Sequence, residues 1–367
     1  MLVTFLSENL QKTISFLNHA VSLRNQLPIL SNFLIQAKNG KLILSATDLE
    51  IGIVSEVSAN IEKEGEATVP AKSFYDFISS VGSQKLTLES RETELTLKGG
   101  RIKASFPVSA AEDFPKLFEK KGEKLLELEK KDIDKYVGRV SFAAAIDSLR
   151  PALSGVLIES AKDGLLFVTT DQYRLSYQKT SLKTTGELKK PIVVPARLVK
   201  ELMFLKEEGP IEFFYADENN QIIFSQNQTN IVGRLIDAEF PAYEKIIPID
   251  FNTKTKLGRE EFLNAIKICS IFARESANIV KIAIEKEKIT VSANSPSVGE
   301  DTVEIDAKTI GEENEIAFNA KYLIDILSAL EEEEIIFEMN GPLNPGIFRI
   351  PEDKNFFHLV MPIRVQG

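Results

Sequence analysis

The chain has 367 residues, which is too long for one ordinary hydrophobic core and predicts two or three domains. Hydrophobic residues make up 43% of the sequence, and the mean hydropathy is −0.07. The sequence contains no apolar run of about 18 residues and no secretory signal pattern. We therefore expect a soluble protein without a membrane span. The net charge of −10 excludes a protein that coats nucleic acid with its whole surface, although a local basic face remains compatible with it.

An amphipathic helix is predicted near the start of each third of the chain. The three segments share one spacing of apolar residues, at offsets 0, 4, 7 and 11, which is one stripe of a helix. These residues are Leu10, Ile14, Leu17 and Val21; Ile133, Val137, Val140 and Ala144; and Phe262, Ile266, Cys269 and Ala273.

A β-hairpin is predicted after each of these helices. Residues 32–48 form two alternating apolar runs around Asn39-Gly40, a strong hairpin signal. Residues 155–171 repeat the pattern around Asp163-Gly164, and residues 280–294 repeat it without a glycine. The order of helix and hairpin is therefore the same in all three sections.

A second helix is predicted after each hairpin, starting at Val69, Val194 and Phe318. In the first two copies a proline precedes alanine, and proline suits a first helical turn because it needs no amide partner there. Asn319 replaces the proline in the third copy and can cap the helix with its side chain.

These observations predict an α+β protein built from three tandem copies of one unit. The boundaries follow from the repeat spacing, giving domains 1–124, 125–252 and 253–367. The first boundary falls in a charged run at residues 120–132 and the second near the proline-bearing stretch 246–256, both suited to links between domains.

The residues that most catalytic and metal sites need are scarce. No Walker loop, dinucleotide glycine fingerprint, HExxH pair or CxxC motif occurs, and the two histidines, His19 and His358, are far apart. The one cysteine, Cys269, excludes an internal disulfide framework, fits a reducing cytoplasm and occupies a core position of its helix. We therefore predict no cofactor, no metal and no catalysis; an enzyme with its site in the loops stays the poorer alternative.

Motifs spread over the whole chain resemble those of the bacterial β sliding clamps, the DNA polymerase III β subunits. They include LPILSNFLIQ and TDLEIGI in the first section, TTDQYRLSY in the second, and FNAKYLIDIL and LVMPIRV in the third. The resemblance implies three clamp domains with helices inside and antiparallel sheets outside, and a head-to-tail homodimer that closes a ring around double-stranded DNA. Tandem repeats have unlike ends, and a heterologous contact that closes after two subunits gives such a ring.

The resemblance also implies the partners of a cytoplasmic processivity factor. These are the replicative polymerase α subunit, an ATP-dependent clamp loader, and other polymerases and repair proteins that carry clamp-binding peptides. A repeat-built scaffold that binds peptides but never encircles DNA is the second functional hypothesis, and it differs from the first by lacking ring closure.

A cation recurs in the first turn of the second helix, at Lys72, Arg197 and Lys321. Because a cation there opposes the helix dipole, we interpret the recurrence as phosphate contact without base readout. The alternative is a surface ion pair with the acid four residues later, Asp76, Glu201 or Asp325. The predicted DNA-facing residues are Arg24, Lys72, Arg150, Arg197, Lys12, Lys135, Arg139 and Lys200, with Lys321 a weaker candidate.

The resemblance implies a hydrophobic cleft for partner peptides between the second and third domains. Its predicted residues are Leu153, Thr170, Tyr173, Arg174, Leu175, Pro241, Ile246, Asn319, Tyr322, Val360, Met361, Pro362, Ile363 and Arg364. Aliphatic walls, an adaptable Met and a few polar groups suit such a cleft, but Leu175, Ile246 and Val360 are equally well explained as plain core. Gln172-Tyr173 departs from the Gly-His common in the family, and a bulkier rim would narrow the peptide preference.

A third set of residues is predicted to close the ring. Basic and aromatic residues on a first-domain strand would meet acidic and apolar residues of the third domain, with apolar contact supplying affinity and charge the register. The set is Arg101, Lys103, Phe106, Ile271, Phe272, Glu300, Asp301 and Glu304. Unrelated surface charge is the alternative.

Overall fold

The computed structural model describes residues 1–22, 27–146, 149–182, 188–297 and 299–364. Two compact units account for them: the first includes residues 1–131 and 200–235, and the second includes residues 132–182, 188–199 and 236–364. Each unit is built from antiparallel sheets with helices packed against them. Among the described residues, no helix is both long and apolar enough to cross a membrane.

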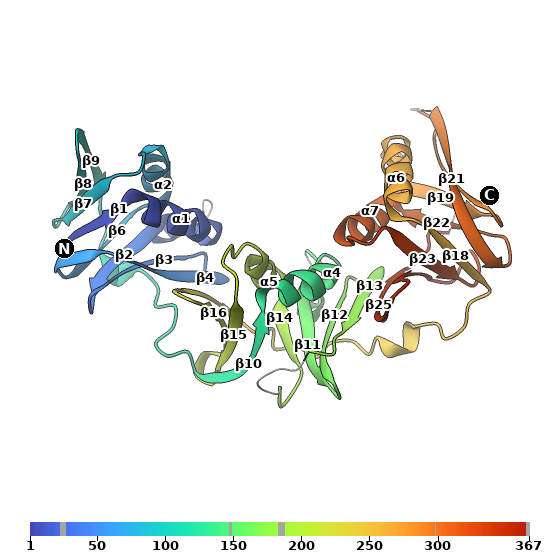
Figure 1. The fold of residues 1–367 in the computed structure, drawn as a ribbon, viewed down its shortest axis with the longest axis horizontal. Helices are drawn as coiled ribbons and strands as arrows, with labels where there is room; N and C mark the ends of the chain where they lie inside the picture. Colours follow the sequence, from blue (N-terminus) through green and yellow to red (C-terminus); the bar gives the residue numbers. More distant parts are fainter. Residues whose placement is uncertain (23–26, 147–148, 183–187, 298, 365–367) are drawn as a thin grey trace. The chain divides into compact units, whose positions relative to one another are not determined.

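The first unit contains two antiparallel sheets. The five-stranded sheet has the order β5 (Asn60–Lys63), β1 (Leu2–Leu6), β7 (Lys85–Ser90), β8 (Glu94–Gly99) and β9 (Ile102–Pro107). The eight-stranded sheet has the order β10 (Glu123–Glu129), β15 (Pro210–Ala216), β16 (Gln221–Gln226), β17 (Thr229–Arg234), β4 (Ile51–Val57), β3 (Lys41–Thr47), β2 (Asn32–Lys38) and β6 (Gly65–Pro70). Helices α1 (Ser7–Leu17) and α2 (Ala71–Ser80) pack against each other and against these strands (Figure 1).

The second unit contains a twelve-stranded arrangement. Its order is β14 (Ile192–Pro195), β11 (Gly155–Ala161), β12 (Gly164–Thr170), β13 (Arg174–Lys179), β25 (Asp353–Val360), β24 (Gly346–Ile350), β23 (Glu334–Met339), β18 (Thr253–Gly258), β21 (Gly299–Gly311), β20 (Lys288–Ser295), β19 (Ile279–Ile284) and β22 (Asn314–Asn319). Helix α6 (Arg259–Ala273) packs against α7 (Ala320–Ala329) and against β20 and β21.

The remaining helical segments are short. They are α3 (Lys130–Asp132), a π-helical turn (Ile133–Val137), α4 (Gly138–Ser141), α5 (Ala196–Met203), and 3₁₀ turns at Asn18–Ala20, Pro28–Ser31, Ala111–Asp113, Pro151–Ser154, Asp217–Asn219 and Glu244–Ile246. The first helix of the second repeat is therefore α3, the π turn and α4 in succession, and it is the least regular of its three copies.

The apolar stripes predicted from the sequence are buried in all three repeats. Leu10, Ile14 and Leu17 are at most 1% exposed, and all four predicted residues of α6 are fully buried. Val21 and Ala144 differ, because the helices end before them and each lies in the following segment. The prediction of an amphipathic helix in each repeat is confirmed, although the stripes predicted for the first two copies extend past the end of the helix.

The three predicted hairpins are present, but one turn was misplaced. β2 and β3 are joined by Asn39-Gly40, both with positive φ, as predicted. In the second hairpin Ala161 pairs with Gly164, so the turn is Lys162-Asp163 and Gly164 opens β12. A side chain at Gly164 would approach the Thr180 carbonyl oxygen to 2.3 Å, so this glycine serves a close strand approach.

The sheets continue from one repeat into the next. β4 of the first repeat pairs with β17 of the second, and β13 of the second pairs with β25 of the third. The strands of the second repeat divide between the two neighbours, with β10 and β15–β17 joining the first repeat and β11–β14 joining the third, which is why the chain forms two units and not three. Boundaries at residues 124 and 252 stay a prediction.

Candidate functional site

A polar turn between β12 and β13 organises the surface that was predicted to bind partner peptides. Asp171 Oδ1 accepts the backbone N–H groups of Tyr173 and Arg174, and Thr170 Oγ1 accepts the N–H of Gln172 and donates to the Arg174 carbonyl. Gln172 has a φ of 80°, a left-handed conformation that costs energy for any residue except glycine. The turn holds Tyr173 outward with 60% of its surface exposed.

Arg174 connects this turn to helix α7. Its guanidinium bonds Asp171 (2.9 Å), Asp325 (2.7 Å) and the Phe142 carbonyl (3.1 Å), and it lies 4.6 Å from the centre of the Tyr322 ring. Only 6% of Arg174 is exposed. Because its donors are taken by these groups, Arg174 fixes the surface from beneath and does not offer a free charge to a ligand. The sequence analysis missed the structural role of Asp171 and Asp325, although the Thr-Asp pair before the turn is a recognisable signal.

The predicted cleft residues divide into a buried layer and an exposed layer. Tyr173, Ile246 and Met361 are 60%, 47% and 37% exposed. Pro241 and Arg364 are also exposed, whereas Asn319, Tyr322, Pro362 and Ile363 are half-buried. The buried layer consists of Leu153, Thr170, Arg174, Leu175 and Val360. Leu175 and Val360 are thus core residues, as the alternative interpretation had it, while Ile246 is not.

The C-terminal segment is fixed on both sides of this surface. The Met361 N–H donates to the Tyr173 carbonyl and the Ile363 N–H donates to the Ala317 carbonyl, both at 2.8 Å. The Tyr173 and Tyr322 rings are nearly parallel, with centroids 6.4 Å apart. Asn319 caps α7 by accepting the Lys321 N–H, as predicted. Residues from β13, α7 and the C-terminal segment therefore converge on one apolar and aromatic surface.

The recurring cations lie in the first turns of α2, α5 and α7, as the repeat spacing predicted. Lys321 forms the ion pair with Asp325 (2.9 Å) that the alternative interpretation proposed, whereas Lys72 has no ion pair with Asp76. Glu201 hydrogen-bonds His19 at 2.8 Å. The exposed members of the predicted DNA-facing set are Lys12, Lys72, Lys135, Arg150 and Arg197; Lys200 is half-buried, and Arg24 lies outside the described residues.

Arg139 was wrongly placed in the DNA-facing set. It is 6% exposed, and its guanidinium pairs with Glu332 and with Asp353 (2.9 Å) and donates to Gln178. Removing it from these carboxylates to reach a phosphate would leave buried charge without a partner. Periodicity placed Arg139 on the helix correctly but gave no sign that two acids of the third repeat lie opposite it.

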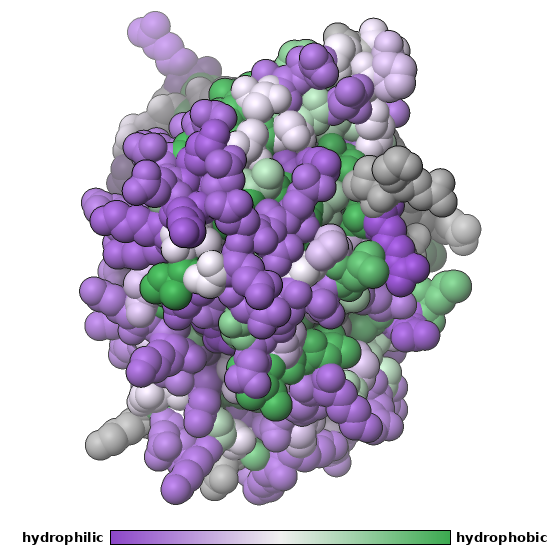
Figure 2. Space-filling view, turned by 90° about the vertical axis from the view of Figure 1, so that its right-hand side faces the viewer, coloured by the Kyte–Doolittle hydropathy of each residue, from purple (hydrophilic) through white to green (hydrophobic). Residues whose placement is uncertain are grey.

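Two strands have edges suited to contact with another chain. Within the described residues, β9 pairs only with β8, so its other edge is open. Residues 299–306 of β21 pair only with β20, because β18 covers residues 307–311 instead. Ile271 on α6 is 52% exposed. The face of the molecule drawn in Figure 2 is mainly hydrophilic and carries small apolar patches.

Several predicted interface residues already have partners within the chain. Phe106 is 7% exposed and packs against Phe74 and Phe77, so its assignment to the interface was wrong and it is a core residue. Glu304 pairs with Lys288 at 2.7 Å. Arg101, Lys103 and Glu300 are exposed; Asp301 and Phe272 are half-buried. Aromatic identity alone could not separate a core Phe from an interface Phe.

The groups that would carry catalysis are sealed in the interior. Cys269 is fully buried, and burial together with the Asp301 carboxylate raises the pKa of its thiol to about 12. Ser176 and His358 form a hydrogen bond of 2.6 Å, but both are fully buried, and burial next to Arg174 lowers the pKa of His358. Among the described residues no cluster of ligands that could hold a metal occurs.

Comparison with known proteins places the chain in a family over nearly its whole length. Profiles of the N-terminal, central and C-terminal domains of the DNA polymerase III beta subunit match residues 1–118, 127–242 and 244–364. A beta sliding clamp of Staphylococcus aureus is 28% identical over 358 residues, which cover 94% of each chain.

Solved structures agree with these matches. The DNA polymerase sliding clamp of Bacillus subtilis aligns with a TM-score of 0.92 at 26% identity, and the DNA polymerase III beta subunit of Thermotoga maritima with 0.90 at 27%. A sliding clamp of Bartonella birtlesii bound to griselimycin aligns with 0.92 at 26%, and each of the three alignments covers 100% of both chains. The chain therefore belongs to the DNA polymerase III β subunit family, the sliding clamps, which are non-catalytic processivity factors.

Proposed function

We propose that two copies of this chain close head to tail into a ring that encircles duplex DNA without sequence preference and tethers the replicative polymerase in the cytoplasm. Family membership over all three domains carries this proposal. In this proposal each subunit has three domains, at residues 1–124, 125–252 and 253–367. An ATP-dependent loader would open the ring, since the sequence offers no nucleotide site of its own.

The DNA-facing surface of the proposed ring consists of cations on the repeated helices and on segments next to them in the sequence. Lys72 supports it best, because it has no carboxylate partner among the described residues and stands where a cation opposes the helix dipole. Lys12, Lys135, Arg150, Arg197 and Lys200 complete the set, together with Arg24. Phosphate contact of this kind carries no sequence information, and the ring can therefore slide.

The partner site is proposed on the surface around Tyr173, Tyr322 and Met361. An apolar side chain of a partner peptide would lie on the exposed layer, while Leu175 and Val360 support it from the core. Polymerases, the loader and repair proteins with clamp-binding peptides would compete for it. The exposed Tyr173 side chain beside Tyr322 would narrow the surface at the rim.

Ring closure is proposed along β9 of one subunit and residues 299–306 of its partner. Both edges are open within the described chain, and Arg101 and Lys103 carry charge opposite to Glu300 and Asp301. Ile271 would add apolar contact. Unlike edges at the two ends of a chain are what a heterologous, closing contact needs.

Retention on DNA tests the ring. After loading onto circular duplex, the protein should co-migrate with the circle and dissociate when the DNA is cut once, because only topology holds it. Sedimentation should give a dimer at micromolar concentration. A monomer that binds polymerase peptides but is never retained on circles would support the scaffold hypothesis instead.

Peptide affinity tests the partner site separately. Met361→Ala combined with Leu175→Ala should weaken binding of a polymerase-derived clamp-binding peptide by about tenfold or more, as expected for loss of buried apolar contact. Ile310→Ala, at an exposed residue of β21 remote from the surface, is the matched control. Unchanged affinity in the double variant would show that the peptide binds elsewhere.

A further inference from the structure

The junction between the first and second repeats carries a second copy of the turn that organises the partner site. Asp48 Oδ1 accepts the N–H groups of Glu50 and Ile51, and Thr47 Oγ1 accepts the Leu49 N–H and donates to the Ile51 carbonyl. Every bond has its counterpart in the turn from Thr170 to Arg174. Leu49 has a φ of 77°, matching the strained Gln172.

The strands that follow the two turns also pair in the same register. The pair Gly52–Val232 of the first junction corresponds to the pair Leu175–Leu359 of the second. In the same way, the pair Ile51–Gly233 corresponds to the pair Arg174–Val360. The linker after each repeat contributes a Phe-Pro pair, Phe114-Pro115 in one case and Phe240-Pro241 in the other. The first junction is therefore built on the same plan as the second.

A cavity of about 180 Å³ lies at this first junction. Its walls include Thr47, Leu49, Gly52, Pro115, Leu117, Val232 and Arg234. Gly52 and Gly233 stand at the places held by Leu175 and Val360 in the second junction. A Cβ at Gly52 would lie 2.8 Å from Val232 and 3.0 Å from Leu117, so these two side chains take the place of the Leu175 side chain and form the wall of the cavity. The volume is below the roughly 300–1,000 Å³ of small-molecule sites and suits one inserted side chain.

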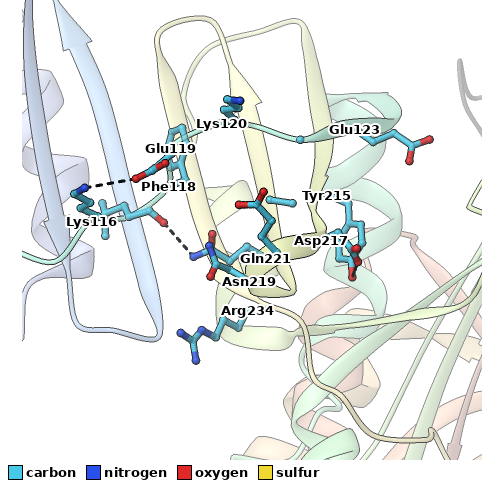
Figure 3. Close-up of a pocket in the computed structure, with 14 residues that line it drawn as sticks. Lys116, Phe118, Glu119, Lys120, Glu123, Tyr215, Asp217, Asn219, Gln221 and Arg234 are labelled. Atoms are coloured by element: carbon cyan, nitrogen blue, oxygen red, sulfur yellow. Dashed lines mark hydrogen bonds and ion pairs between the residues drawn. The ribbon is translucent and has the colours of Figure 1, made fainter.

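A larger cavity of about 890 Å³ adjoins it and shares Lys116, Leu117, Gln221 and Arg234 (Figure 3). Figure 3 shows Arg234 and Lys116 toward one end and Asp217 and Glu123 toward the other. Arg234 is exposed and has no ion pair within the described chain. Lys116 is paired with Glu119 of the same wall at 3.5 Å, so Arg234 supplies the positive charge at one end, while Asp217 and Glu123 supply negative charge at the other.

An unsatisfied acceptor lies between these ends. Gln221 donates through Nε2 to the Leu117 carbonyl at 3.0 Å, but its Oε1 is buried and has no donor among the residues that the structure describes. A buried acceptor without a partner costs on the order of 1–3 kcal/mol, so a ligand N–H that reached Oε1 after the covering groups moved aside would be stabilised. The ligand should accordingly carry N–H donors as well as charge.

We propose that this junction is a second peptide-binding site, for an extended segment with an acidic residue next to a small aliphatic one and a basic residue farther along. The aliphatic side chain enters the small cavity against Leu117 and Val232. Its acidic neighbour pairs with Arg234, a backbone N–H reaches Gln221, and the basic residue meets Asp217. The site lies within the first compact unit and is independent of the partner surface around Tyr173.

Methyl NMR on the full-length protein tests the proposal with two synthetic probes. One is acetyl-Glu-Val-Gly-Gly-Lys-amide, and the other exchanges its Glu and Lys. With ¹³C-labelled Leu and Val methyls, the first peptide should shift Leu117 and Val232 in a saturable manner. The exchanged peptide should bind more weakly than the first, by up to about fivefold, which is the effect expected from one misplaced charge pair.

Variants make the outcome decisive. Arg234→Glu should remove the preference for the first peptide, and Arg234→Gln should reduce it. Lys354→Glu is the matched control and should keep the preference. The methyl spectrum of each variant reports whether it is folded. Absent shifts at Leu117 and Val232, equal binding of both peptides, or an unchanged preference in Arg234→Glu would each overturn the proposal. Because the polymerase-derived peptide is titrated in the same samples, loss of the partner site at Met361 is distinguished from loss of this one.

Discussion

Two groups of cations in this molecule look alike in the sequence and behave differently in the structure. Arg139 and Arg174 lie in the interior of the second unit, each held by two carboxylates. Lys72 lies in the first turn of α2, exposed and without an ion pair to any residue in the described part of the chain. The comparison teaches that a basic residue at a repeated position is available to DNA only where the fold has placed no acid against it.

Truncating a buried cation should give the largest effect. Arg174→Met leaves Asp171 and Asp325 without their common partner, and we expect the free energy of unfolding to fall by about 3 kcal/mol. Denaturant unfolding measures this change. Lys72→Met is the control and should shift stability by no more than about 0.5 kcal/mol. Similar losses of unfolding free energy in both variants would contradict the difference between the buried Arg174 and the exposed Lys72.

The buried histidine beside Arg174 should make the second unit sensitive to acid. His358 is neutral in the folded chain because burial lowers its pKa below the ordinary 6.5, whereas the unfolded chain takes up a proton below that pH. Stability from this group is therefore present above pH 6.5 and declines as the pH falls below it.

Between pH 7.5 and 5.5 the loss of unfolding free energy should be on the order of 1 kcal/mol, and it should be absent in His358→Leu. Unfolding curves at the two pH values, compared between the parent chain and the variant, isolate this residue from all other titrating groups. An equal pH dependence in both proteins would contradict the assignment.

The exposed Lys72 should contribute to DNA affinity and not to the stability of the fold. Lys72→Met should weaken binding to duplex DNA at low salt by about fivefold and reduce the slope of log affinity against log salt by about one for each Lys72. Arg139→Met should leave the slope unchanged, although it destabilises the fold. A salt titration by fluorescence anisotropy measures both, and a slope that falls for Arg139→Met would return that residue to the DNA-facing set.

The smallest expected effect concerns the strained turn. Gln172 has a positive φ, so Gln172→Gly should raise the free energy of unfolding by about 0.5 kcal/mol. The matched exchange Asp163→Gly, in a hairpin turn without positive φ, should lower it by a similar amount because glycine gives the unfolded chain more freedom. Thermal unfolding of both variants checks the sign, and a stabilising Asp163→Gly would argue against strain at Gln172.

Local patterns in the chain were sufficient for the repeated elements. Apolar spacing located α1 and α6, Asn39-Gly40 located the first hairpin, and Asn319 was correctly expected to cap α7. Each of these depends on residues close together in the chain, whose periodicity and turn chemistry act before any tertiary contact forms.

Long-range packing decided everything that depends on a partner distant in sequence. Arg139 meets Glu332 and Asp353, and Phe106 is enclosed by the aromatic residues of α2; neither contact has a local signature. The fusion of three repeats into two compact units follows from pairing of β4 with β17 and of β13 with β25. Sequence alone determined the repeated unit, whereas the fold determined which of its charged and aromatic side chains remain free to bind, because burial and pairing are properties of the assembled chain.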